Sequence, residues 1–372
     1  MRIGVPKEIK NAERRVGLTP ASVRELVAHG HDVLIESSAG IGIGATDAAY
    51  AATGARIIDS PEQVFDGADL IVKVKEPQPS ERAMLRADHV LFTYLHLAPD
   101  PDQAYDLISS GATCVAYETV TDAAGRLPLL APMSQVAGRM SVQAGAHCLE
   151  SPQGGAGLLL GGVPGVPPAN VVVIGGGVVG ENAIEMAVGL DASVTVLDRD
   201  VGVLDRLAQR FGPALRTVYS TATALDDLVI GADLVIGAVL VKGSRAPRLV
   251  TKDMVAEMHV GAVLVDVAID QGGCFATSRA TTHDEPTYVV DGVVHYCVAN
   301  MPGAVPRTST YALNNVTLPH VLALADLGAS EALRRDRFLR DGLNVCRGNV
   351  TDAAVAEALG LDAVDPLAAM SA

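Results

Sequence analysis

A glycine-rich segment at residues 171–180, VVVIGGGVVG, has the residue types and spacing of a dinucleotide-binding turn. Its glycines at the characteristic spacing, Gly175, Gly177 and Gly180, follow a short apolar run, and a predicted helix begins near Val178. The first glycine of such a turn allows a tight bend, the second lets the backbone approach a pyrophosphate, and the third lets helix and strand pack closely. The positive end of the helix then faces the phosphates. An ordinary glycine-rich turn would not need this strand–turn–helix context, so we expect nucleotide binding here.

The charge that follows the next strand indicates which dinucleotide would bind. Asp198 ends the strand predicted at Ser193–Leu197, where a carboxylate can accept hydrogen bonds from the adenosine ribose hydroxyls. A carboxylate at this position also repels the 2′-phosphate of NADP, so NAD is the predicted cofactor. Arg199 stands beside Asp198 and keeps NADP open as the alternative.

A second group of polar residues follows predicted strands in the first part of the chain. Lys75 and His96 come directly after strands, and Arg15 lies in the loop after the first strand. Ligands of open α/β sheets bind beyond the carboxyl ends of the strands, so these positions can reach a substrate. An arginine binds a carboxylate through two parallel hydrogen bonds, a lysine polarises a carbonyl or holds the second carboxylate oxygen, and a histidine transfers protons near neutral pH.

Each of these residues also has a purely structural interpretation. His96 could be a buried core histidine, and Lys75 could be a solvated charge at the edge of the sheet. Arg14 stands next to Arg15, and either arginine could be the one on the surface. Position alone does not decide between these interpretations.

Asp270 and Asn300 occupy comparable positions in the second part of the chain. Asp270 follows the strand predicted at Val263–Ala268 with one residue between, and Asn300 follows the strand predicted at Val293–Val298. An aspartate can orient or deprotonate water or an amine, but Asp270 could also merely cap a turn. Asp266 is the competing carboxylate, and strand spacing places it on the opposite face. A cleft between the two sheets would bring both groups of residues around a nicotinamide.

Two series of strands and helices would position these residues. Short β-branched runs alternate with helical patterns, which predicts an α/β fold of two doubly wound, Rossmann-type parallel sheets separated by an active-site cleft. A Gly- and Pro-rich stretch at residues 151–168 separates the two series. The predicted strands are Arg2–Pro6, Asp32–Glu36, Asp69–Val74, Val90–Leu95 and Thr113–Tyr117 in the first series, and Asn170–Ile174, Ser193–Leu197, Asp233–Ile236, Val263–Ala268 and Val293–Val298 in the second.

A helix is expected after the first strand, and two further helices are expected to connect the two series. Thr19 is the predicted cap of the first helix, with Pro20 at its first position. Helices at Pro132–Glu150 and Tyr311–Gly328 lead into and out of the second series. The last residues, Leu339–Ala372, show only helical or irregular patterns and are expected to fold back on the first domain.

Composition excludes several classes of function. The chain has 372 residues, of which 49% are hydrophobic and 19% charged, as in a globular protein of two domains. A net charge of −15 without any basic run argues against nucleic acid and anionic membranes as partners. The five cysteines form no CxxC pair, so structural zinc and a disulfide framework are not expected. The opening MRIGVPKEIK lacks the apolar stretch of a signal peptide, and the most apolar window, Val171–Leu190, contains two glutamates, so we expect a cytoplasmic protein.

Several segments of the chain, taken in order, resemble the alanine dehydrogenase family. They are PKEIKNAERRVGLTP, KVKEP, LFTYLHLA, LPLLAPMSQVAGRM, GGVPGV, the glycine-rich turn, VDVAIDQGGC and VANMPGAVPRTSTYALNN. The resemblance covers nearly the whole chain and fades after about Leu327. It implies a discontinuous substrate domain, 1–128 plus 307–372, with an NAD-binding domain, 129–306, inserted between its parts. It also implies a homohexamer and the reversible, NAD-dependent oxidation of L-alanine at its CH–NH2 group to pyruvate and ammonia.

The resemblance also implies roles for individual residues. Arg15 and Lys75 would bind the substrate together with Asn300, His96 would be the acid and base, and Asp270 would be the second catalytic group. The NAD contacts would come from Ser134, Gly175, Gly177, Val178, Val179, Gly180, Asp198, Ser220, Val239, Leu240, Val267, Ala268, Ile269, Asp270, Arg279, Val298, Ala299, Asn300 and Met301.

Two positions depart from the pattern of the family. Val203 stands where some members place a basic residue near the ribose, so that contact is not expected here. Leu327 stands where some members have a histidine that could hold a metal, so no metal site is predicted. Two alternatives to a dehydrogenase are the nucleotide-binding subunit of a proton-translocating transhydrogenase, which would need a membrane partner, and a non-catalytic NAD sensor. A sensor would need none of the polar residues at the strand ends.

Overall fold

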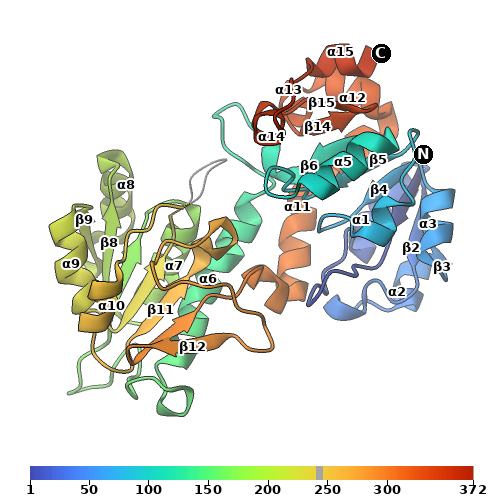
Figure 1. The fold of residues 1–372 in the computed structure, drawn as a ribbon. Helices are drawn as coiled ribbons and strands as arrows, with labels where there is room; N and C mark the ends of the chain where they lie inside the picture. Colours follow the sequence, from blue (N-terminus) through green and yellow to red (C-terminus); the bar gives the residue numbers. More distant parts are fainter. Residues whose placement is uncertain (240–245, 372) are drawn as a thin grey trace. The chain divides into compact units, whose positions relative to one another are not determined.

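The computed structural model describes residues 1–239 and 246–371, which form two compact α/β units (Figure 1). One unit comprises Met1–Met133 and Val305–Ala372, and the other comprises Ser134–Ala304. The predicted assignment of these parts to a substrate domain and an NAD-binding domain concerns their function and stays a prediction. No helix in the described part of the chain is long and apolar enough to span a membrane.

The first unit is built on a mixed sheet with the strand order β15-β14-β6-β5-β4-β1-β2-β3. The strands are β1 (Arg2–Val5), β2 (Asp32–Glu36), β3 (Arg56–Ile58), β4 (Leu70–Val72), β5 (Val90–Thr93), β6 (Thr113–Ala116), β14 (Leu343–Cys346) and β15 (Asn349–Val350). The helices are α1 (Pro20–Ala28), α2 (Asp47–Ala51), α3 (Pro61–Gly67), α4 (Pro79–Arg82), α5 (Pro101–Ser110), α11 (Pro306–Leu327), α12 (Ala329–Arg335), α13 (Arg337–Arg340), α14 (Ala353–Leu359) and α15 (Pro366–Ser371). The predicted cap of α1 is confirmed, because the Thr19 hydroxyl accepts a hydrogen bond from the backbone N–H of Ser22.

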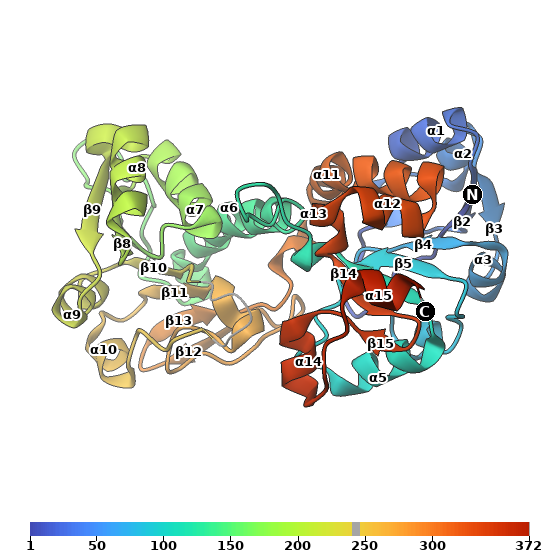
Figure 2. The same ribbon diagram turned by 90° about the horizontal axis from the view of Figure 1, so that it is seen from above.

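The prediction that residues 339–372 contain no strand is wrong. β14 pairs antiparallel with β6, and β15 pairs antiparallel with β14. Figure 2 shows β14 and β15 near the last helices, α14 and α15. A two-residue turn joins them, and both of its residues, Arg347 and Gly348, have positive φ angles, as tight hairpins require. The segment does fold back on the first unit, as expected, but it extends the sheet, and the sheet is therefore not purely parallel.

The second unit contains a sheet with the strand order β12-β13-β11-β10-β7-β8-β9. The strands are β7 (Asn170–Ile174), β8 (Ser193–Asp198), β9 (Leu215–Tyr219), β10 (Leu234–Gly237), β11 (Val263–Asp266), β12 (Thr287–Val290) and β13 (Val293–Tyr296). The helices are α6 (Ala131–Cys148), which begins at the boundary of the units, α7 (Val178–Gly189), α8 (Val201–Phe211), α9 (Ala222–Ile230) and α10 (Lys252–Glu257). All neighbouring strands are parallel except the edge strand β12, which runs antiparallel to β13.

The apolar run of β7 follows from its place in the middle of this sheet. Val171 and Val173 belong to a hydrophobic cluster on one face, whereas Val172 and Ile174 belong to a cluster on the other face. Successive side chains of a strand point to opposite faces, so a strand buried on both sides must be apolar at every position. β7 leads directly into the glycine-rich turn, and this rigid, doubly covered strand fixes where that turn begins.

Candidate active site

The glycine-rich turn joins β7 to α7. The structural reason for a glycine differs from one position of the turn to the next. Gly175 has a φ of +99°, which favours glycine. A Cβ on Gly180 would lie 1.8 Å from the carbonyl oxygen of Gly175, so only glycine fits there. By contrast, a Cβ on Gly177 would have no heavy atom of the described residues within 4 Å beyond its chain neighbours. The fold thus requires Gly175 and Gly180, while the open space at Gly177 fits the approach of a pyrophosphate.

Asp198 lies at the carboxyl end of β8, next to this turn. Its Oδ2 accepts a hydrogen bond from the backbone N–H of Gly176 at 2.6 Å, and its Oδ1 accepts one from the N–H of Asp200 at 2.9 Å. Ser220 directly follows the neighbouring strand β9, and its N–H donates to the Asp198 carbonyl at 2.9 Å. The predicted ribose ligand therefore also holds the glycine-rich turn, a second role that the sequence did not indicate.

The other predicted cofactor contacts of this unit follow strand ends or begin helices. Val239 follows β10, the residues 267–270 form a short 3-10 helix after β11, and residues 298–301 follow β13. Because these strands are parallel, their carboxyl ends lie at the same edge of the sheet as the glycine-rich turn. Ser134 lies in the first turn of α6, and the Arg279 guanidinium lies over the Tyr288 ring at 4.0 Å. Leu240 lies outside the described residues.

Asp270 and Asn300 lie side by side. The backbone N–H of Asn300, which has a φ of +56°, donates to the Asp270 carboxylate at 3.3 and 3.4 Å, and the Asp270 side chain is exposed. Asp266, its competitor, is fully buried and accepts hydrogen bonds from the backbone N–H groups of Ala268 and Cys274. Burial raises the pKa of Asp266. Asp266 therefore holds the loop that follows β11, and Asp270 is the carboxylate that can meet a ligand.

In the first unit, Arg15 and not Arg14 faces inward. The Arg15 side chain is buried and forms a two-pronged ion pair with Glu13, with Nε at 2.7 Å from Oε1, whereas Arg14 is exposed. The same carboxylate accepts a hydrogen bond from the Arg15 backbone N–H at 2.9 Å, and Nη1 lies 3.0 Å from the Sδ of Met133. Burial alone would lower the pKa of Arg15, but the Glu13 carboxylate outweighs it and raises that pKa. Glu13 thus fixes the plane of a charged guanidinium.

A buried network of charges anchors the segment after β4 that carries Lys75. Lys75 was predicted to come directly after a strand, but β4 ends at Val72, three residues earlier. The Nζ of Lys73 is fully buried and donates to Glu8 at 3.0 Å and to Glu81 at 2.7 Å. The other oxygen of Glu8 accepts hydrogen bonds from the backbone N–H groups of Val74 at 2.7 Å and Lys75 at 3.3 Å. Sequence reasoning missed Lys73, Glu8 and Glu81. Of the two lysines in KVKEP, the first is structural, and the second, Lys75, is only half-buried.

His96 is an exposed side chain on an unusual backbone, which excludes the interpretation as a core histidine. Its side chain is 45% exposed and stacks on the buried ring of Tyr94, with the two ring planes 2° apart. Its φ is +51°, a strained value for a histidine. The Glu118 carboxylate accepts hydrogen bonds from the N–H groups of Leu95 at 3.2 Å and His96 at 2.6 Å, and its Oε1 lies 3.7 Å from His96 Nδ1. Tyr94 and Glu118, which sequence reasoning did not single out, therefore set the position of the imidazole.

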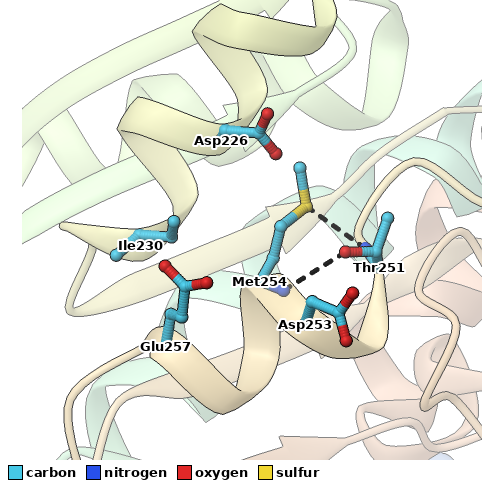
Figure 3. A pocket seen from close by; sticks show the side chains of 6 residues that line it. All are labelled: Asp226, Ile230, Thr251, Asp253, Met254 and Glu257. Carbon is cyan, nitrogen blue, oxygen red and sulfur yellow. Dashed lines mark hydrogen bonds between the residues drawn. The ribbon is translucent and has the colours of Figure 1, made fainter.

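A pocket of about 380 Å³ lies elsewhere in the second unit, between α9 and α10 (Figure 3). Three of the side chains that line it are carboxylates, those of Asp226, Asp253 and Glu257, and Thr251 caps α10 at its rim. Such a lining repels the anionic phosphates of a dinucleotide. None of the predicted site residues lines this pocket, and we assign it no role in the reaction. Within the described residues, no group of three or more His, Cys, Asp or Glu side chains is arranged to hold a metal ion.

The chain is similar to known proteins over its full length. Residues 4–137 match the family description "Alanine dehydrogenase/PNT, N-terminal domain", and residues 141–353 match "Alanine dehydrogenase/PNT, C-terminal domain". The chain is 61% identical to the alanine dehydrogenase of Halomonas elongata, with 98% of each chain covered. It is 55% identical to that of Bacillus subtilis, with 98% of this chain and 96% of the relative covered.

Solved structures give the same picture of the fold. An L-alanine dehydrogenase structure of 52% sequence identity matches with a TM-score of 0.94 and covers 97% of this chain and 99% of its own. A transhydrogenase from Sinorhizobium meliloti matches with a TM-score of 0.81, covering 95% of this chain and 100% of its own, but is only 23% identical and thus shares the fold alone.

Proposed function

The chain belongs to the alanine dehydrogenase/PNT family, and from that premise we propose that it is an NAD-dependent L-alanine dehydrogenase. In this proposal the enzyme converts L-alanine, oxidised NAD and water reversibly into pyruvate, ammonium, NADH and a proton. The observation that carries the proposal is identity of more than half the residues, over nearly the full length, to enzymes named alanine dehydrogenase. An oriented arginine, a half-buried lysine and an exposed histidine in the first unit support it, because they suit an amino-acid substrate.

The substrate carboxylate would bind to Arg15 and Lys75. Glu13 already orients the Arg15 guanidinium, and the Glu8 network holds the backbone at Lys75, so little ordering remains for the substrate to supply. Asn300, which lies beside Asp270, would also bind the substrate. The turn and strand ends of the second unit would hold NAD, with the pyrophosphate at Gly177 and the adenosine ribose at Asp198.

The proton transfers would fall to His96 and Asp270. NAD, when bound, supplies the chemistry that accepts a hydride from the alanine Cα, which leaves iminopyruvate. His96 would take up a proton as water adds to the imine carbon and return one to nitrogen as the C–N bond breaks, giving pyruvate and ammonia. Asp270 would orient the attacking water and the departing ammonia. Glu118 would stabilise the imidazolium that forms on His96 during these steps.

The reaction can be tested directly with purified protein. NADH should appear, by its absorbance, when the protein is given NAD and L-alanine, and should be consumed with pyruvate and ammonia. A panel of other L-amino acids is the comparison and should give far slower NADH formation. A non-catalytic sensor would bind NADH without any turnover, and a transhydrogenase-like subunit would not reduce NAD with alanine; either result contradicts the proposal.

Asp198 should determine the preference for NAD over NADP. The wild-type enzyme should have a much higher kcat/KM with NAD, because Asp198 repels a 2′-phosphate. Asp198→Ala should narrow the ratio of the two kcat/KM values, although both values should fall because the hydrogen bond to Gly176 is also lost. Arg199→Ala is the companion variant and should lower activity with NADP more than with NAD. Equal efficiency of the wild type with both cofactors would contradict the assignment of Asp198.

A substitution at Gly177 should weaken NADH binding without lowering the stability of the fold. Its φ of −69° is accessible to alanine, and a Cβ there has open space, so Gly177→Ala should leave the unfolding temperature unchanged. A methyl group against the pyrophosphate should raise the Kd for NADH about tenfold or more. Gly189→Ala, at an equally open position near the end of α7, is the control and should change neither quantity. If Gly177→Ala binds NADH as tightly as the wild type, the pyrophosphate does not bind at this turn.

We also propose that the enzyme is a cytoplasmic homohexamer. The loop before β7 supports self-association, because it exposes apolar side chains that include Leu159, Val163 and Val166, each more than half exposed. A reducing compartment suits the free cysteines of the chain, all of them buried. The mass of the protein in solution, measured by light scattering, tests the number of subunits, and a monomer would contradict it.

A further inference from the structure

Arg206 lies on α8 and reaches back to the glycine-rich turn. Its Nη2 donates to the carbonyl oxygen of Gly176 at 3.3 Å, and its Nη1 donates to Glu181 in the first turn of α7. Gly176 is thereby held on both sides, because its N–H donates to the Asp198 carboxylate at 2.6 Å. The residue just before the open space at Gly177 is thus fixed by one acidic and one basic side chain.

The packing of α8 explains why Arg206 reaches this turn. A Cβ on Gly176 would lie 2.6 Å from a methyl carbon of Val203, which places that face of α8 directly against the turn. Residues three apart share one face of a helix, so Arg206 extends from the same face one turn later. The start of α8 is fixed by Asp200, whose side chain accepts a hydrogen bond from the N–H of Gly202 at 2.8 Å. Arg206 is therefore carried by a helix whose position is set at the turn itself.

Glu181 places a negative charge close to where an anionic pyrophosphate would bind. Burial alone would raise the pKa of Glu181, but Arg206 and Arg210 outweigh burial and lower it, so the carboxylate stays ionised. A carboxylate in the first helical turn interacts favourably with the helix dipole, but it repels a phosphate bound at the same end of the helix. Both arginines pair with Glu181, and they are similarly exposed. Arg210, however, uses its other nitrogen for Glu185 at 2.7 Å, whereas Arg206 uses its own for Gly176.

We propose that Arg206 is a positioning residue for the cofactor, which holds the Gly176 carbonyl and thereby fixes the turn against which the pyrophosphate of NAD binds. The inference rests on the proposed NAD site and adds a residue to it. Arg206 acts through the turn and not by contact with the reacting atoms. Arg206 and Arg210 both neutralise the charge of Glu181, but only Arg206 also holds Gly176. Comparing variants of the two arginines therefore separates the effect of positioning the turn from the effect of losing a positive charge.

The experiment compares Arg206→Ala with Arg210→Ala in the full chain. Each variant removes one positive charge from Glu181, but only the first loses the hydrogen bond to Gly176. Arg206→Ala should raise the Kd for NADH, measured by fluorescence, about tenfold, and the loss should persist at high ionic strength. Arg210→Ala should raise it no more than about twofold, and that effect should fade as salt screens the charge. In steady-state kinetics the KM for NAD should rise in Arg206→Ala while kcat at saturating NAD stays unchanged.

The outcomes separate this inference from the proposed function. Equal effects of the two variants, or an Arg206→Ala effect that salt abolishes, would reduce Arg206 to a neutralising charge and overturn the inference. A wild-type protein that binds no NADH would instead overturn the NAD site itself. Unfolding temperatures report whether each variant is folded. Arg206→Lys provides a milder change if the alanine variant does not fold, and it should weaken NADH binding more than Arg210→Lys does.

Discussion

Replacing His96 with alanine should lower kcat by about a hundred- to ten-thousand-fold, because a positioned side chain that transfers protons typically contributes that much. The imidazole is exposed, lies on the Tyr94 ring and is held by Glu118, so its removal takes away no core packing. The Kd for NADH should change little, since His96 is not among the proposed NAD contacts. Turnover with L-alanine and NADH fluorescence give the two measurements.

His29 offers a control for this variant. It lies in the same unit, its side chain is also 45% exposed, and it pairs with a carboxylate, that of Asp326. His29→Ala therefore removes a comparable histidine that has no proposed part in the reaction, and kcat should be unchanged. Full activity of His96→Ala would show that His96 transfers no essential proton.

Asp270→Asn tests the second proposed catalytic group and its link with His96. The substitution keeps the shape of the side chain and removes its charge, so turnover should fall while the protein stays folded. If both residues serve one sequence of proton transfers, the double variant should lose much less than the product of the two single losses. Strictly multiplicative losses would mean that the two residues act independently.

The glycine-rich turn could be predicted from the sequence because its signals are local. The φ of Gly175 and the contact of Gly180 with the preceding residues depend on a few neighbours in the chain, and α7 begins at Val178 as expected. The α/β fold with two sheets is confirmed for the same reason, since the alternation of strands and helices follows from short-range periodicity. Once the strands are known, the candidate site residues follow, because ligands of parallel α/β sheets bind beyond the carboxyl ends of the strands.

The partners of the site residues could not be predicted, because they come from distant parts of the chain. Lys73 and Lys75 look alike in KVKEP, and only Glu8, 65 residues before Lys73, shows which lysine is buried. Glu118 is 22 residues from His96 and approaches it only when β5 and β6 pair. Tertiary contacts of this kind determine which charged side chains are buried, and the local sequence around each residue does not show them. Resemblance to a family supplied the expected role of His96, which its position alone had left open.

Five strands were not predicted: β3, β9, β12, β14 and β15. For β14 and β15 the reason is a different one. They are short, and they lie at the edge of the sheet next to β6, a strand from a much earlier part of the chain. A signal was nevertheless present, because Arg347 and Gly348 separate two short runs by the two residues of a tight hairpin. An edge hairpin of this kind gains its stability from β6 and not from its own sequence, so its local pattern is weak.

Arg15→Lys should raise the KM for L-alanine and for pyruvate by about ten- to a hundredfold, with little change in the Kd for NADH. A hydrogen bond to a charged group contributes about 1.5–3 kcal/mol, and about 1.4 kcal/mol corresponds to a factor of ten. Lysine can keep the ion pair with Glu13, so that carboxylate is not left buried without a counter-charge, as it would be in Arg15→Ala. A single ammonium cannot reproduce the planar fork that binds a carboxylate through two parallel hydrogen bonds.

Arg14→Lys is the control, because Arg14 is the neighbouring arginine and its side chain is exposed. It should leave both KM values and the unfolding temperature unchanged. A larger effect of Arg14→Lys than of Arg15→Lys would show that the wrong arginine has been assigned to the substrate. If Arg15→Lys lowered the unfolding temperature but left both KM values unchanged, Arg15 would be only the buried partner of Glu13. A rise in the KM values in a protein of unchanged stability is the one result that places the substrate carboxylate on Arg15.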